Sequence, residues 1–131
     1  MKQKVSDYIA EYIAQWGIRD VFTVTGGGAM HMNDAFGHHP KLHCTYQHHE
    51  QACAMAAEAY ARMDNRMAAV CVTTGPGATN AITGVLGGWM DSIPMLVFSG
   101  QARYATTVPA SGLPLRSMGV QECNIVPVVS S

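Results

Sequence analysis

The feature that most constrains the fold is an alternation between short apolar runs and longer segments with helical character. Four runs have the length of β-strands and the β-branched or apolar content typical of them: DVFTVTG (20–26), KLHCTY (41–46), MAAVCVTT (67–74) and PMLVFSG (94–100). Strands that alternate with helices indicate βαβ units, in which parallel strands are covered on both faces. We therefore predict an α/β fold with a mostly parallel central sheet flanked by helices on both faces.

The helices expected between these strands differ in character. In the first one, apolar residues recur at steps of three and four, which predicts an amphipathic helix that ends at Gly17: Val5, Tyr8, Ile9, Tyr12, Ile13 and Trp16. Three more helices are expected over 29–37, 50–63 and 77–91. The loop over 101–113 is long for a compact domain, so we expect it to serve the function or to lean on another part of the protein.

Composition limits the class of protein. With 131 residues, 48% hydrophobic and 13% charged, the chain can bury the core of a single domain over residues 1–131. A net charge of −1 gives no basis for binding nucleic acid or an anionic membrane, and we predict neither partner. Because no apolar run approaches the roughly 20 residues that span a bilayer, and no signal-peptide core is visible, a cytoplasmic location is expected. The apolar ending NIVPVVSS leads us to expect a piece of a longer protein.

Several kinds of catalytic or metal site are disfavoured. The four cysteines lack C-x-x-C spacing and are expected to be reduced core residues: Cys44, Cys53, Cys71 and Cys123. The histidines lack the spacing of metal ligands, so no metal site is predicted. A nucleophilic pair of His49 and Cys53 is a weak alternative, since a cysteine in an Ala/Met helix usually packs in the core. Glu50 and Glu58 would lie about 12 Å apart on a helix, too far for a retaining glycosidase.

The predicted binding region is the edge of the sheet where the strands end. Ligands of parallel sheets bind beyond the carboxyl ends of the strands, and three segments fall there: TGGGAM (25–30), YQHHE (46–50) and TTGPGATN (73–80). We call the first and third of these the first and second glycine loops. Neither loop has the spacing of a P-loop or of a dinucleotide fingerprint. On spacing alone, tight turns are the simplest interpretation.

Four segments in order resemble the pyrimidine-binding domain of thiamine diphosphate enzymes, nearest to acetolactate synthase large subunits. They are GIRDVFTVTGGGAMHMNDAF (17–36), HHEQACAMAAEAYAR (48–62), VCVTTGPGATNAITGVLGGWMDSIPMLVFSGQ (70–101) and GVQECNIV (119–126). The resemblance covers nearly the whole chain and is specific for the superfamily. It is much weaker for the substrate, because residues 104–117 depart from acetolactate synthases.

The resemblance assigns roles to individual residues. It implies that Glu50 hydrogen-bonds a ring nitrogen of the aminopyrimidine and promotes the imino tautomer that removes the proton from thiazolium C2. One loop would approach the cofactor from the neighbouring subunit, although it lacks the proline common in the family: Gly26, Gly27 and Gly28. A second would line the pyrimidine pocket: Thr74, Gly75, Pro76, Gly77 and Asn80. Gln121 matches a glutamine on the substrate side.

The resemblance also implies cofactors and partners. Thiamine diphosphate would activate a 2-oxo acid in a decarboxylase or carboligase that is a homodimer or tetramer. Mg²⁺ and the diphosphate would be held by another domain of a three-domain chain, because this sequence lacks the Gly-Asp-Gly and Asn-Asn motifs. We therefore expect the 131-residue chain to be inactive alone, and whether a middle domain binds FAD stays open. The alternative is a free-standing α/β regulatory or subunit-like domain that binds another nucleotide or a partner protein.

Overall fold

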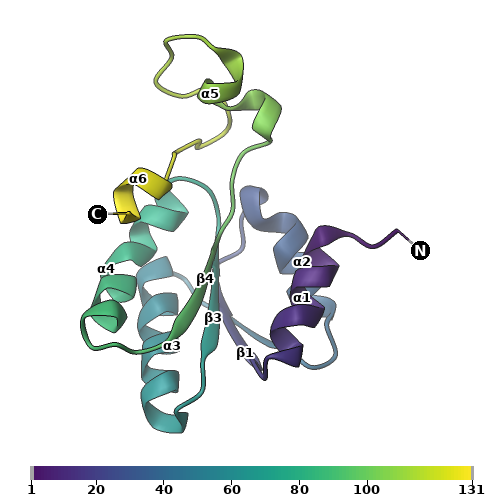
Figure 1. Cartoon of the computed structure of the whole chain (residues 1–131), viewed down its shortest axis with the longest axis vertical. Coiled ribbons are helices and arrows are strands. Elements are labelled where there is room, and N and C mark those ends of the chain that lie inside the picture. Colours follow the sequence, from purple (N-terminus) through teal and green to yellow (C-terminus); the bar gives the residue numbers. More distant parts are fainter. Residues whose placement is uncertain (1, 131) are drawn as a thin grey trace.

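A computed structural model of the chain describes residues 2–130 and contains one parallel sheet between two layers of helices (Figure 1). The strands are β1 (Asp20–Thr23), β2 (His43–Tyr46), β3 (Ala68–Val72) and β4 (Met95–Ser99). They lie in the order β2-β1-β3-β4, and every neighbouring pair is parallel. The predicted α/β class and parallel sheet are therefore confirmed.

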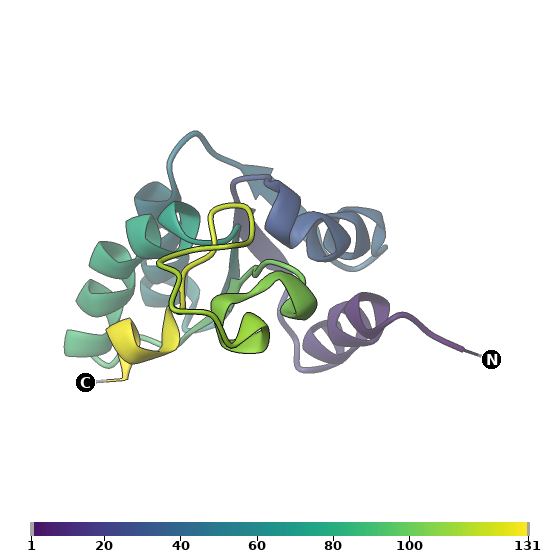
Figure 2. The same ribbon diagram turned by 90° about the horizontal axis from the view of Figure 1, so that it is seen from above.

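Helices cover both faces of the sheet, as predicted. One face carries α1 (Val5–Gln15) and α2 (Met30–His38), and the other carries α3 (Glu50–Asp64) and α4 (Pro76–Met90), as seen from above in Figure 2. The remaining helical turns are short: η1 (Gly27–Ala29), η2 (Tyr104–Thr106), α5 (Val108–Ser111) and α6 (Val126–Val129). None of the helices within residues 2–130 has both the length and the apolar character needed to cross a membrane.

The core lies on both sides of β3, all of whose residues are buried. Its side chains alternate between two clusters, as expected for a strand with period two. Ala69 and Cys71 pack with Val21 and Phe36 beneath α1 and α2. Ala68, Val70 and Val72 pack beneath α3 and α4. This double burial explains why the strand reads as a continuous apolar run.

Helix α1 forms where predicted, but its buried face differs from the one that the aromatic spacing indicated. Gly17 follows the helix with φ +90°, as expected for a C-terminal glycine. The buried positions are Ser6, Ala10, Ile13 and Ala14. Three aromatic side chains instead form an exposed row of neighbouring rings: Tyr8, Tyr12 and Trp16. Both sets of residues have helical spacing. The small side chains let the helix backbone lie closer to the sheet than the aromatic side chains would.

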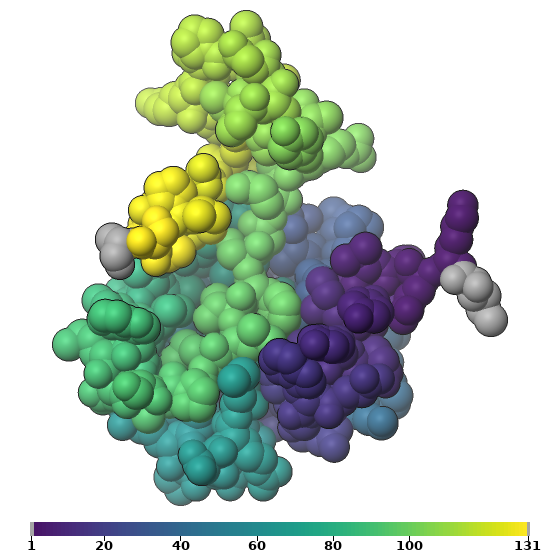
Figure 3. Space-filling view, in the orientation of Figure 1, coloured from purple at the N-terminus to yellow at the C-terminus, as the bar shows by residue number. Residues whose placement is uncertain are grey.

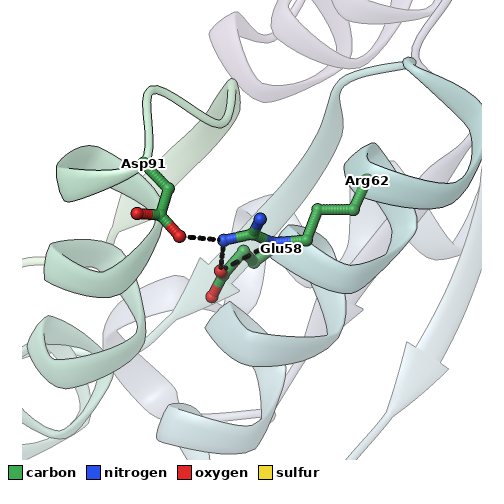
Figure 4. Close-up of polar contacts among 3 residues, drawn as sticks. All are labelled: Glu58, Arg62 and Asp91. Atoms are coloured by element: carbon green, nitrogen blue, oxygen red, sulfur yellow. Dashed lines mark hydrogen bonds and ion pairs between the residues drawn. The ribbon is translucent and has the colours of Figure 1, made fainter.

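The two helices on the other face pack with very little space between their backbones. A Cβ atom on Gly84 of α4 would lie 2.6 Å from Cβ of Ala54 in α3. Near the far ends of the same helices, the Arg62 guanidinium pairs with Glu58 at 2.6 Å and also with Asp91 (Figure 4). The small residues and this bridge fix α3 against α4.

Residues 101–125, which we call the C-terminal arm, extend beyond the carboxyl ends of the strands. Figure 3 shows the arm standing above the rest of the molecule, and Figure 2 shows it crossing over the space between the helix layers. The Glu122 carboxylate accepts hydrogen bonds from the N–H groups of Val108, Met118 and Gly119 at 2.7–3.2 Å. The Gln101 side chain donates to the Cys123 carbonyl at 2.6 Å. These contacts close the arm into a loop over the sheet edge.

Candidate functional site

The two glycine loops are in direct contact at the carboxyl ends of β1 and β3. The N–H group of Gly28 donates to Thr73 Oγ1 at 3.1 Å. A Cβ atom on Gly26 would lie 2.4 Å from Thr73 Cβ, and one on Gly28 would lie 2.4 Å from Thr74 Cγ2. Glycine is needed at both positions because the loops approach too closely for any side chain. The structure thus brings together two of the three segments predicted for this edge.

The third segment brings Glu50 to the same edge. His49 precedes α3 as its N-cap, where its Nδ1 accepts from the Gln51 N–H group at 3.1 Å. The Glu50 side chain is half-buried, and its Oε2 accepts from Asn80 Nδ2 of α4 at 3.1 Å. Its Oε1 lies 3.5 Å from the place that a Cβ atom on Gly77 would occupy. The carboxylate therefore lies against the second glycine loop, beside the N-termini of α3 and α4, which favour negative charge.

The second glycine loop also supports the C-terminal arm. Gly75 has φ +56°, and a Cβ atom there would lie 2.1 Å from the Gln121 carbonyl oxygen. Thr74 Oγ1 donates to the Val120 carbonyl at 3.5 Å. Pro76 is exposed at the start of α4, where its fixed φ suits a first helical turn. The loop therefore connects the carboxylate with the arm.

A cavity of about 360 Å³ lies between the first glycine loop and the arm. Its lining includes four of the predicted site residues: Gly27, Gly28, Thr74 and Gln121. Glu50 and Asn80 are not part of this lining, and Glu50 lies instead against Gly77 of the second glycine loop. The site thus has two parts, which are the carboxylate held by Asn80 and the cavity beneath the arm.

The four cysteines are free thiols. Cys53 and Cys71 are buried, as predicted, whereas Cys44 and Cys123 are only half-buried. Burial, followed by the negative charge of Glu50, raises the pKa of Cys53 to about 11. Burial likewise raises the pKa of Cys71 to about 12. Since the thiolate is the reactive form, these groups are poor nucleophiles near neutral pH. The alternative pair of His49 and Cys53 therefore has no chemical support.

Two of the histidines outside the glycine loops pair with acidic residues. His39 Nε2 lies 3.0 Å from Glu11, and His43 Nδ1 lies 3.2 Å from Asp20. The hydrogen bond from His39 is the main reason that the pKa of Glu11 is below its ordinary value. Within residues 2–130, His, Cys, Asp and Glu form no group of three or more that could hold a metal ion.

Sequence reasoning missed residues that build the site through backbone contacts. Thr73 joins the glycine loops, and Gln101 and Glu122 close the arm. Gln101 and Glu122 do stand within the segments that carry the family resemblance, so that resemblance was the available signal. Their partners are backbone groups distant in sequence, and spacing alone does not identify such partners.

The fold and this edge define an α/β ligand-binding domain with two bare loops beside one held carboxylate. Residues 3–127 match the family described as thiamine pyrophosphate enzyme, N-terminal TPP binding domain. The chain belongs to this family, as its sequence motifs predicted.

Similar proteins are acetolactate synthases by name. The chain is 34% identical over 97% of its length to acetolactate synthase 2, chloroplastic, of Zea mays. It is 35% and 40% identical, over 73% of its length, to the acetolactate synthase large subunits of Lactococcus lactis subsp. lactis and Buchnera aphidicola subsp. Schizaphis graminum. It spans 18% of the maize protein and 17% of each bacterial one.

Proposed function

We propose that this domain binds the aminopyrimidine part of thiamine diphosphate and that Glu50 activates it within an acetolactate synthase-like enzyme acting on a 2-oxo acid. The observation that carries the proposal is the half-buried Glu50 carboxylate, held by Asn80 at 3.1 Å against the second glycine loop. Family membership supports the cofactor class. The relatives' names support the type of reaction.

The residues at this edge fit a flat heterocycle. A Cβ atom on Gly27 would meet nothing within 4 Å, so the outer side of the first glycine loop is open and bare. A ring could therefore approach the backbone without meeting a side chain. When bound, thiamine diphosphate supplies a thiazolium carbon that loses a proton and adds to the carbonyl carbon of the substrate.

Glu50 has one oxygen held and one available. Asn80 occupies Oε2, and within residues 2–130 no hydrogen bond engages Oε1. Oε1 is the atom we assign to the ring nitrogen, with which the carboxyl group shares a proton. Asn80 is a positioning residue, because its amide fixes the rotation of the carboxyl group. The N-termini of α3 and α4 stabilise the ionised form that remains after proton transfer.

The test is proton exchange at C2 of the cofactor, followed by NMR in deuterated buffer, in the enzyme that carries this domain. Glu50→Gln is expected to slow exchange by roughly 10²–10⁴-fold, the usual contribution of a positioned acid–base group. Glu58→Gln is the matched control, because Glu58 lies on the same helix and pairs with Arg62. An unchanged exchange rate in Glu50→Gln would remove the proposed role.

The rest of the assembly is proposed from the family. Since the chain spans 18% of the maize relative, we propose a longer three-domain protein in which another domain binds Mg²⁺ and the diphosphate. The 131-residue chain should then bind the cofactor weakly and show no turnover, and titration calorimetry with Mg²⁺ measures this. Tight, magnesium-dependent binding would contradict the proposal. A homodimer or tetramer, transferase or lyase chemistry, and a cytoplasmic location are proposed on the same basis, with FAD left open.

A further inference from the structure

The cavity beneath the arm carries a single formal charge. Among the described residues that line it, Arg103 is charged and the others are glycine, apolar or neutral polar residues. The cavity is contiguous with the first glycine loop through Gly27 and Gly28. Its volume of about 360 Å³ is near the lower end of the range for small-molecule pockets, roughly 300–1,000 Å³. A small anionic ligand would match both the charge and the size.

The charge of Arg103 is not neutralised by a neighbour. Within residues 2–130, no Asp or Glu lies within ion-pair distance of Arg103. The acid of the arm, Glu122, is engaged with three backbone N–H groups. The Arg103 carbonyl accepts from the Thr106 N–H and hydroxyl groups, both at 2.8 Å, so its backbone is anchored. The backbone of Arg103 is therefore held at the cavity, and its exposed side chain remains available to a ligand.

A second cavity differs in that its cationic side chains are paired with an acid. About 320 Å³ in volume, it lies between α1 and α2 and is also lined by charged residues. There Lys4 and His38 both pair with Asp34, at 3.8 Å and 3.1 Å. Because Asp7 also lines it, acidic side chains outnumber Lys4, and the cavity offers no site for an anion. Among the described residues, the cavity beneath the arm is therefore the one that has both an unpaired cation and a lining from the predicted cofactor loops.

We propose that Arg103 binds the carboxylate of the 2-oxo acid and so selects anionic substrates over neutral carbonyl compounds. This inference rests on the proposed function. A guanidinium presents two parallel N–H donors that match the two oxygens of a carboxylate. The substrate carbonyl would then lie on the side of the cavity that faces the first glycine loop. Arg103 is thus a specificity-determining residue that acts on the substrate and not on the cofactor.

The experiment uses the full-length enzyme loaded with thiamine diphosphate and Mg²⁺. The probe is oxamate, an unreactive planar anion shaped like a three-carbon 2-oxo acid, titrated by calorimetry. Arg103→Gln should weaken oxamate binding by about 10- to 100-fold, as expected for a charge-assisted hydrogen-bonded pair. Arg103→Lys should lose less oxamate affinity, because lysine keeps the positive charge but cannot form the bidentate hydrogen bonds. Arg116→Gln, on the same arm but outside the cavity lining, should bind oxamate as the unmodified enzyme does.

Two further measurements separate this inference from the proposed function. Exchange of the C2 proton should continue in Arg103→Gln, because Arg103 does not contact Glu50. If exchange continues and oxamate affinity is unchanged, the role of Arg103 is refuted while the proposed function stands. If the unmodified enzyme catalyses no exchange, the proposed function fails and this inference with it.

The KM values for CO₂ release and for the carbonyl acceptor, measured separately, identify which carboxylate Arg103 holds. A rise in the first assigns Arg103 to the acid that loses CO₂. A rise in the second assigns it to the acid that is retained. If Arg103→Gln raises neither KM, the inference is overturned.

Discussion

Glycine is required at Gly75 and at Gly27 for different physical reasons. At Gly75 the backbone has φ +56°, and the Gln121 carbonyl leaves no room for a Cβ atom. At Gly27 the position of a Cβ atom is open and the side chain would enter the site. Gly75 therefore supports the fold, whereas Gly27 leaves the outer side of its loop bare, where we propose that the cofactor binds.

Gly75→Ala is expected to lower the free energy of unfolding by about 1–3 kcal/mol, because strain at this φ adds to the contact with Gln121. Urea unfolding of the 131-residue chain, followed by circular dichroism, measures the change. Stability equal to that of the unmodified chain would show that the second glycine loop and the arm are not held together at this point.

Gly27→Ala should weaken cofactor binding and leave the stability of the domain nearly unchanged. Stability should change by less than about 0.5 kcal/mol, since the new methyl group meets no atom within 4 Å. Thiamine diphosphate should bind more weakly to the enzyme that carries the substitution, because the methyl group occupies the open side of the loop. Calorimetric titration tests this, and unchanged affinity would place the cofactor elsewhere.

At the scale of elements, one arginine links α3 to α4. Arg62 contacts Glu58 on its own helix and Asp91 at the end of α4 (Figure 4). Arg62→Gln should lower the urea midpoint at low ionic strength, and the loss should shrink in concentrated salt, which screens partly exposed charges. Arg66→Gln is the control, because Arg66 pairs with Asp64, only two residues away. Equal losses in both variants at every salt concentration would contradict the bridging role.

The arm should loosen in acid. The N–H group of Val108, followed by those of Met118 and Gly119, lowers the pKa of Glu122 below its ordinary 4.5. A lowered pKa in the folded state means that these bonds stabilise the arm above pH 4.5 and are lost as the pH falls through the native value. Amide exchange measured by NMR should show protection of these three N–H groups at neutral pH. Glu122→Ala should abolish that protection, and persistent protection would contradict the role of the carboxylate.

The sequence was sufficient to predict the main strands and helices, but not which side of every helix is buried. Apolar runs identified the strands because β3 is buried throughout and its neighbours β1 and β4 are buried or half-buried at every position except Ser99. The predicted apolar face of α1 was right at Ile13 and wrong for the aromatic residues, because the aromatic row and the small-residue row both have helical spacing. The strand ends placed Glu50 and the glycine loops at one edge of the sheet, whereas their roles came from the family resemblance, since their spacing matched no general motif. The closure of the arm by Glu122 depends on backbone partners that a sequence does not reveal.

At the scale of the whole molecule, large apolar side chains are exposed in groups on α4 and α1. On α4 they are Leu86, Trp89 and Met90, and on α1 they are the row of aromatic residues. Trp89 is 74% exposed and Trp16 is 63% exposed. Apolar surfaces of this kind favour association with other protein surfaces.

We therefore expect the 131-residue chain to self-associate as its concentration rises. Sedimentation equilibrium should give an average mass above the 14.0 kDa of one chain. Trp89→Gln and Trp16→Gln form a matched pair that shows whether α4 or α1 carries the contact. A mass that stays at 14.0 kDa at every concentration would contradict the prediction.

The arm begins at Gly100, where two backbones cross. A Cβ atom on Gly100 would lie 2.5 Å from the Gly28 carbonyl oxygen, and no side chain lies between the two segments to absorb a displacement. A small shift at the root of the arm is therefore passed directly to the first glycine loop. Binding on the two sides of this crossing should consequently be coupled, each ligand changing the affinity for the other by the same factor.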